Sequence, residues 1–242
     1  MTTTYLLGEM SNGSAKLSDS YPRGWGRMYV ERPINPFDGE PWALDNGVFR
    51  AWNNDEDYAP RFRTFEKKLH EASSVVYDRG SLPLFVVIPD RPADPDSILE
   101  SLAWLEEYEL DGLQEEVDPF GHYYGSGYGL LPLALAVQDG MSPEALEELR
   151  DPETDEPILS KLAYLFVGGS DDFKETVGIW RELADRWGLK LHFGRATQSR
   201  IRDAVSAGSD SADSAHPVRL GGSRWTRFLE VADKELAKER VA

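Results

Sequence analysis

Polar residues follow most of the short apolar runs in this sequence, at the point where each run ends. Asp45, Asp90 and Gln138 come at or just after the ends of three runs, and Gly168-Gly169 and Gly194-Arg195 follow two more. In parallel α/β folds the carboxyl ends of the strands share one face, so these groups can converge on one ligand. Carboxylates in such a position can hold or transfer protons. The pattern therefore predicts a binding or catalytic site without fixing its reaction.

A further polar segment, residues 208–219 (GSDSADSAHPVR), lies where another strand belongs. Asp210 and Asp213 are three residues apart, so on an extended strand they point to opposite faces and cannot form one metal-binding pair. In a barrel, one of them would face the interior and the other the wall. The four histidines have no metal-ligand spacing, so we predict no metal and no cofactor.

The elements that position these residues are indicated by short apolar runs. Runs of this kind are typical of strands that are buried on both faces. They lie at 5–8, 42–44, 84–88, 133–137, 163–167 and 190–193.

Helical patterns lie between or after several of these runs, at 97–109, 172–187, 197–207 and 223–242. The repeated order of strand, loop and helix predicts a parallel sheet with crossover helices. The periodicity alone fits a barrel as well as an open doubly wound sheet. However, the chain has neither a G-x-G-x-x-G helix start nor a phosphate-binding G-x-x-x-x-G-K-[ST] loop, which are the usual nucleotide-binding signals of an open sheet. We treat residues 1–242 as one domain, with loop insertions at 111–129 and 151–157.

The composition limits the classes of protein to which the chain can belong. It has 43 acidic and 26 basic residues among 242, a net charge of −17, and arginine outnumbers lysine by 18 to 8. This balance is typical of an acid-coated, salt-adapted surface. If the substrate is a nucleic acid, the basic contacts must be local or the working salt must be high. The absence of cysteine excludes disulfides, thiolate metal sites and cysteine nucleophiles.

No apolar window is long enough for a transmembrane helix, and no basic segment precedes the short apolar stretch at the N-terminus. We therefore expect a cytoplasmic protein without a membrane partner.

The order of the motifs resembles that of the tRNA-guanine transglycosylases. The matching segments are LDNGVF (44–49), IPD (88–90), VQDG (137–140), VGG (167–169) and GSDSADSAHPVR (208–219). The family carries D-S-G-G-[FY]-Q, a strand-end Asp, V-Q-G-G, a Gly-Gly pair and G-x-D-x-F-D-x-x-x-P-T-R in the same order. The last motif is the most specific, because its Gly, both Asp, Pro and Arg keep their spacing. The resemblance covers roughly residues 40–220 and implies a TIM-like (β/α)8 barrel whose last strand can be short or degenerate.

The chain departs from the tRNA enzymes in length and in zinc chemistry. It is much shorter than they are, and without cysteine it cannot form their Cys3His zinc module, which belongs to their dimer and tRNA contacts. It looks more like the zinc-free DpdA-like branch of phages, archaeal viruses and bacterial modification islands, which exchanges guanine in DNA for a 7-deazaguanine such as preQ0 or preQ1. The resemblance thus implies DNA and a free deazaguanine base as partners, but no particular oligomeric state. The acidic, arginine-rich composition would suit a virus of a salt-loving host, which would place the protein in the host cytoplasm.

The resemblance also implies roles for individual residues. Asp213 matches the nucleophile, which forms a covalent link to C1′ of the nucleoside, a step for which a carboxylate is suited. Asp45 matches the general acid and base that protonates the departing purine and deprotonates the incoming one. Asp90 matches the residue that reads the N1/N2 edge of the base. Asp210 is expected to be a structural carboxylate.

The remaining base and backbone contacts are implied in the same way. Gln138 and the Gly168-Gly169 pair, through the Gly169 amide, match groups on the O6/N7 side of the purine. The matching positions for its apolar faces are Phe49 and Phe193, either of which could equally belong to the core. Contacts to the nucleic-acid backbone are expected from the basic residues that follow, with surface ion pairs as the alternative role: Arg219 and Arg195, helped by Arg200, Arg202 and Arg224.

Several alternatives remain open from the sequence. The aromatic segment 123–128 (YYGSGY) can be a base-stacking lid or an ordinary loop. The same chemistry can act on tRNA, or the barrel can be an N-glycoside hydrolase that releases the base to water. A non-catalytic acidic binding protein is the alternative outside enzymology. Asp45 and Asp213 argue against that last class, because a protein without chemistry has no need of them.

Overall fold

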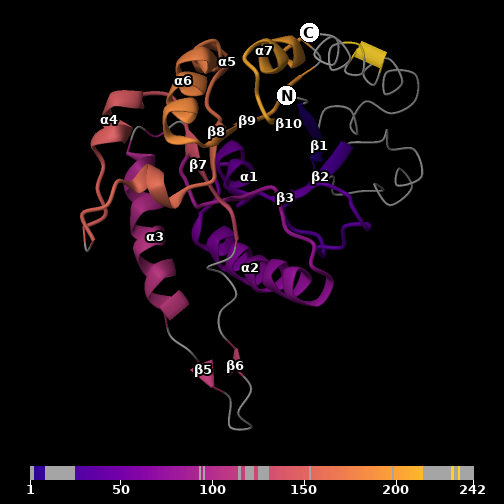
Figure 1. Ribbon diagram of the computed structural model, residues 1–242, viewed down its shortest axis with the longest axis vertical. Coiled ribbons are helices and arrows are strands. Elements are labelled where there is room, and N and C mark those ends of the chain that lie inside the picture. The colour runs from indigo at the N-terminus through magenta and orange to yellow at the C-terminus, as the bar shows by residue number, and fades with distance from the viewer. Residues whose placement is uncertain are drawn as a thin grey trace.

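Eight short parallel strands close into a barrel in the computed structural model of the protein (Figure 1). The structure describes residues 3–8, 25–92, 94, 96–113, 116–117, 123–124, 131–152, 154–197, 199–214, 230–231 and 234. In order around the barrel the strands are β1 (Thr4–Gly8), β10 (Ser211–Ser214), β9 (Lys190–Phe193), β8 (Tyr164–Val167), β7 (Leu133–Val137), β4 (Val86–Val87), β3 (Trp42–Leu44) and β2 (Trp25–Tyr29).

Helices follow several of these strands and cover the outside of the barrel (Figure 1). They are α1 (Val48–Asn53), α2 (Ala59–Arg79), α3 (Ser97–Leu113), α4 (Pro143–Glu148), the 3-10 helix η4 (Ile158–Lys161), α5 (Asp171–Lys174), α6 (Val177–Trp187) and α7 (Ile201–Ser206). A two-stranded antiparallel ribbon of β5 (Glu116–Val117) and β6 (Tyr123–Tyr124) lies apart from the barrel. The alternation of parallel strands and helices confirms the predicted TIM-like (β/α)8 fold.

The polar segment that ends the barrel is a regular strand. In β10 every residue is buried, and the strand pairs in parallel with β9 on one side and with β1 on the other. Leu6 of β1 lies opposite Asp213, so the side chains of both residues point to the same side of the sheet. Closure of the barrel by this short polar strand carries Asp213 into the interior.

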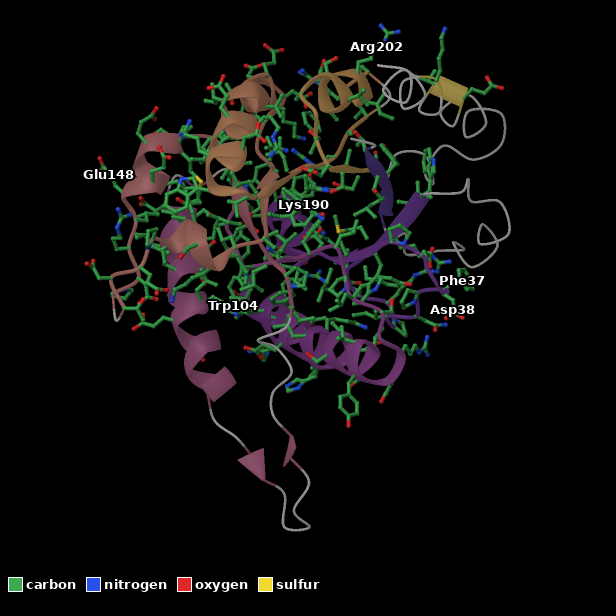
Figure 2. The ribbon with its side chains drawn as sticks, viewed as in Figure 1. Phe37, Asp38, Trp104, Glu148, Lys190 and Arg202 are labelled. Carbon is green, nitrogen blue, oxygen red and sulfur yellow. The ribbon has the colours of Figure 1, made fainter. Side chains whose placement is uncertain are left out.

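Alternate residues of the strands divide the core into two clusters. One cluster, which includes Leu6, Met28, Phe85 and Ala134, fills the barrel interior. The larger cluster lies between the strands and the helices, where Figure 2 shows side chains filling the space. The face of the strand on which a residue lies therefore decides whether its side chain can reach the mouth of the barrel.

Several elements differ from the sequence-based expectations. Strands β2, β5 and β6 and helices α1, α2, α4 and η4 were not predicted. The single helix expected at 172–187 is divided into α5 and α6, and the one expected at 197–207 is the shorter α7. Of the expected insertion at 111–129, the structure describes the end of α3 and the β5–β6 ribbon. All but three residues of the expected helix at 223–242 lie outside the described residues.

Within the described ranges, no helix has both the length and the apolar character needed to cross a bilayer.

Candidate active site

Three carboxyl groups meet at the carboxyl-terminal mouth of the barrel. Asp45 directly follows β3, Asp90 lies beyond β4, and Asp213 is on β10. Asp90 and Asp213 are only 7% and 8% exposed, and Asp45 is half-buried. Burial, and then the nearby charges of Asp213 and Asp90, raise the pKa of Asp45 from 3.8 to about 7. The three groups are therefore close enough to interact electrostatically, although they come from segments far apart in the chain.

One oxygen of the Asp213 carboxylate is held by two donors. Its Oδ1 lies 3.0 Å from Nε2 of His192 and accepts a hydrogen bond of 2.9 Å from the backbone N–H of Arg195. The Asp213 carbonyl accepts a further bond of 2.6 Å from the N–H of Ala196. Among the described residues no donor contacts Oδ2. The carboxylate is thus fixed through one oxygen, and the other can meet a ligand.

Asp45 is suited to proton transfer near neutral pH. Its carboxylate accepts a weak hydrogen bond from the Gly47 N–H, 3.4 Å from Oδ1, and the Asn46 N–H also lowers its pKa. Gly47 has a positive φ of 75°, and an added Cβ there would lie 2.8 Å from the Val30 side chain, so the tight turn after β3 requires glycine. A carboxyl with a pKa of about 7 can donate or accept a proton at similar cost at neutral pH.

Asp90 is oriented by two side-chain amides. Asn46 Nδ2 donates to its Oδ1 and Gln138 Nε2 donates to its Oδ2, each at 2.7 Å. Asn46 also donates to the Ile88 carbonyl and accepts from the Val48 N–H, so its amide orientation is fixed at both ends. Burial raises the pKa of Asp90 to about 6, against the opposing effect of these two donors.

Gln138 thus lies at the predicted site, but its amide nitrogen is directed to Asp90 and to the Ser97 hydroxyl. Its expected contact with the O6/N7 side of a purine stays a prediction.

The Gly168-Gly169 turn after β8 is fixed by neighbouring loops. Gly169 has a φ of 71°, and a Cβ at this position would lie 2.6 Å from Oδ2 of Asp139. The same Asp139 oxygen accepts the Ser170 N–H at 2.7 Å, and the Gly169 carbonyl accepts Nη2 of Arg195 at 2.6 Å. The turn requires glycine, and it links the end of β8 to the residue that follows β9.

Phe49 and Arg195 lie together at the rim of the site. The Arg195 guanidinium is 4.3 Å from the centre of the Phe49 ring, within cation–π range. Trp52, one helical turn further along α1, lies 5.4 Å from Phe49 between ring centres. Phe49 and Trp52 are 36% and 43% exposed, so this aromatic pair faces solvent beside the carboxyl cluster.

Phe193, the other position expected to cover a purine face, lies elsewhere. Its ring is fully buried in the cluster between the strands and the helices, because the neighbouring His192 takes the interior-facing position of β9. Lys174 of α5, only 1% exposed, places its amine 5.8 Å from the Phe193 ring. The structure therefore makes Phe193 a core residue.

The other predicted contacts have different outcomes. Asp210 faces the helices, as expected of the wall-facing aspartate, and pairs with Arg181 of α6 at 2.8 Å. Arg200 pairs with Asp203 and Glu175, so it has the surface ion pairs given above as the alternative role. Arg219, Arg224 and most of the aromatic segment 123–128 lie outside the described residues.

His192, Asn46 and Ser97 belong to the site but were not predicted as site residues. The signal for His192 was present in the sequence: it is a lone polar residue between Leu191 and Phe193 in an apolar strand, and alternation places it opposite to both. Asn46 and Ser97 act through Asp90 and Gln138, and only the three-dimensional contacts reveal them.

Over the described part of the chain, no group of three or more His, Asp or Glu side chains is arranged to hold a metal ion.

Comparison with known proteins assigns the chain to no family. The chain matches no family model and no curated protein. Among solved structures, a crystal structure of tryptophan synthase from M. tuberculosis, in its aminoacrylate- and BRD0059-bound form, aligns with 98% of this chain and 92% of that chain. The identity is 14% and the TM-score 0.45, so no argument is based on this likeness.

Proposed function

We propose that the protein is a DNA guanine transglycosylase, which exchanges guanine in DNA for a 7-deazaguanine base of the preQ0 or preQ1 type. The observation that carries the proposal is the carboxyl cluster at the barrel mouth. There, Asp213 is held through one oxygen, and Asp45, with a pKa of about 7, lies within electrostatic reach. These are the two residues that the transglycosylase motifs assign to nucleophile and proton carrier.

In the first half of the reaction, Oδ2 of Asp213 attacks C1′ of the nucleoside while the bond from C1′ to guanine N9 breaks. The electron pair of that bond goes to the purine, and protonated Asp45 supplies the proton that the departing base needs. The products are a glycosyl ester on Asp213, free guanine and an ionised Asp45.

In the second half, the incoming deazaguanine gives its N9 proton to Asp45 and attacks C1′. The ester bond to Asp213 breaks, and Asp213 leaves as a carboxylate. Its Oδ1 keeps the hydrogen bonds from the His192 ring and the Arg195 N–H, which stabilise the returning negative charge. Asp45 ends protonated, as it began, so the cycle is balanced.

Recognition of guanine is assigned to Asp90. Asn46 and Gln138 each occupy one lone pair of its carboxylate, and each oxygen retains another to accept an N–H from the N1/N2 edge of the base. With a pKa of about 6, Asp90 is mostly ionised at neutral pH, as this acceptor role requires. Phe49, Trp52 and Arg195 at the rim offer stacking surfaces to the flipped base or its neighbour.

DNA is proposed over tRNA because the chain has no cysteine for the zinc module that serves tRNA binding in the tRNA enzymes.

A base-exchange assay tests the proposal. The purified protein is incubated with duplex DNA or with tRNA, plus preQ0 or preQ1, at low and at multimolar salt, and the nucleosides are quantified by mass spectrometry after digestion. We expect deazaguanine in DNA, and its loss in Asp213→Asn by roughly 10³-fold or more. The matched control is Asp210→Asn, which changes an aspartate on the opposite side of the sheet and keeps exchange.

Incorporation into tRNA alone would overturn the choice of DNA. Release of free guanine without incorporation would overturn exchange in favour of hydrolysis, and full activity in Asp213→Asn would overturn the assigned nucleophile.

A further inference from the structure

His192 is completely buried beneath the carboxyl cluster. It lies on β9, and its ring packs against two aromatic side chains, those of Phe166 and Phe85, each with its ring centre 4.7 Å away. The Phe166 ring is stacked on it at an interplanar angle of 27°. Its two nitrogens have different partners: Nδ1 lies 2.8 Å from the Ser211 hydroxyl and Nε2 lies 3.0 Å from Oδ1 of Asp213.

These contacts define one tautomer of the ring. An ionised carboxylate accepts hydrogen bonds and cannot donate them, so the nitrogen that faces Asp213 must carry the proton. The Ser211 hydroxyl can then donate to the bare Nδ1, and the chain Ser211, His192, Asp213 is satisfied throughout. Burial among aromatic rings favours this neutral form, because it lowers the pKa of His192 against the opposing effect of Asp213.

We infer that His192 is a positioning residue for Asp213: its Nε2–H, aligned by Ser211, fixes Oδ1 and leaves Oδ2 as the attacking oxygen. This inference rests on the proposed function for its chemical meaning, but the arrangement itself is a property of the folded chain. The backbone N–H of Arg195, just past the carboxyl end of the same strand β9, binds the same oxygen. Two donors on Oδ1 restrict rotation of the carboxylate, so the nucleophile is held in place before the substrate arrives.

A neutral donor suits this role better than a cation would. A protonated histidine would form a buried ion pair with Asp213 and reduce the reactivity of the carboxylate. A neutral N–H orients the carboxylate and can keep its hydrogen bond when Oδ1 becomes the carbonyl oxygen of the glycosyl ester. Because the same bond is present before and after ester formation, His192 needs no proton transfer of its own.

Two substitutions separate positioning from packing. His192→Phe keeps a ring packed against Phe85 and Phe166 but removes both hydrogen bonds. His192→Gln has an amide N–H that can reach the position of Nε2. We expect His192→Phe to lower kcat of base exchange by about 10- to 100-fold with little change in KM, the effect of losing one hydrogen bond to a charged group. The Gln variant is expected to recover most of this loss.

A second measurement does not depend on activity. ¹⁵N NMR of the histidine-labelled wild-type protein is expected to show His192 with Nε2 protonated and Nδ1 bare, and Ser211→Ala to weaken that preference without disturbing the aromatic packing. A wild-type ring protonated at Nδ1, or a folded His192→Phe variant with full kcat, would overturn the inference. If the wild-type protein exchanges no base at all, the proposed function fails, while the NMR result still decides whether His192 holds Asp213.

Discussion

Asp45 has a pKa raised from 3.8 to about 7 in the folded protein, and this shift couples its protonation to folding. The folded state binds more protons than the unfolded chain between about pH 4 and pH 7, so the contribution of Asp45 to the free energy of unfolding decreases as the pH rises through this range. Above about pH 7, where Asp45 is ionised in both states, it lowers the free energy of unfolding by the full difference between its folded and unfolded pKa values. A residue that is placed for proton transfer thus lowers the free energy of unfolding near neutral pH.

Asp45→Asn removes this cost. We expect the variant to exceed the wild-type protein in free energy of unfolding by about 4 kcal/mol near pH 8, with the difference vanishing towards pH 4. Urea denaturation at a series of pH values measures the gain near pH 8 and its loss towards pH 4. Asp172→Asn, at an exposed position on α5, is the matched control and should show no such gain. A variant no more stable than the wild-type protein at pH 8 would contradict the buried, charge-coupled environment of Asp45.

The same substitution should abolish exchange because Asp45 carries the proton. A gain in stability together with a loss of activity is the combination expected of a functional carboxyl, since a merely structural group would lose both.

At the scale of the elements, the turn after β8 requires glycine at Gly169, whereas helix α6 does not require glycine at Gly178. Gly169 has a φ of 71°, and a Cβ there would lie 2.6 Å from Asp139, whereas a Cβ on Gly178 of α6 would meet nothing within 4 Å. We expect Gly169→Ala to lower the free energy of unfolding by about 1–3 kcal/mol and to reduce exchange, because the turn must move. Gly178→Ala, the control, should raise stability by about 0.5–1 kcal/mol. Thermal or urea unfolding compares the two, and equal effects would contradict the described turn.

Most of the barrel strands were predictable because buried parallel strands are apolar along their whole length. Strand β2 was missed because Gly26 and Arg27 interrupt its apolar run. The structure explains both residues: a Cβ on Gly26 would lie 1.9 Å from the Pro41 carbonyl oxygen, and Arg27 pairs with Glu40 at 2.9 Å. Each is a contact with another part of the chain, which periodicity within the strand cannot reveal.

Helix α2 did carry a readable signal. Phe65, Leu69, Ala72 and Val75 are buried at helical spacing along one face, and the charged residues between them obscured the pattern.

For the candidate site, the carboxyl positions were predictable from the sequence, but their hydrogen-bond partners were not. The positions of Asp45, Asp90 and Asp213 came from motif order, and the structure brings the three together. Phe193 was left open between a purine contact and the core because both faces of a barrel strand are buried. The run of residues 190–193 therefore does not say which face is the interior. The hydrogen-bond partners of Asp90 and Asp213 come from other strands and could not be read from one sequence without the fold.

For the molecule as a whole, the net charge of −17 is the property with the clearest physical consequence. Like charges repel each other across the folded surface, and salt screens this repulsion over a length that falls from about 10 Å at ~0.1 M to about 3 Å at ~1 M. We expect Tm to rise by several degrees between these KCl concentrations at neutral pH. The rise should largely disappear near the isoelectric point of about 4.6. An equal rise at both pH values would assign the effect to something other than charge screening.

The same screening bears on substrate binding. A basic DNA-binding protein loses affinity steeply as salt increases, whereas an acidic one that binds DNA through a few local arginines should lose little or gain.

Labelled guanine shows directly whether Asp213 breaks and remakes a glycosidic bond to guanine in DNA. The protein is incubated with unlabelled duplex DNA and ¹⁵N-guanine, so that the measurement does not depend on which deazaguanine is the natural substrate. Mass spectrometry of the digested DNA then measures labelled deoxyguanosine. We expect incorporation by the wild-type protein and by Asp210→Asn, and none by Asp213→Asn. Absence of label in all three, at low and at high salt, would contradict the proposed base exchange.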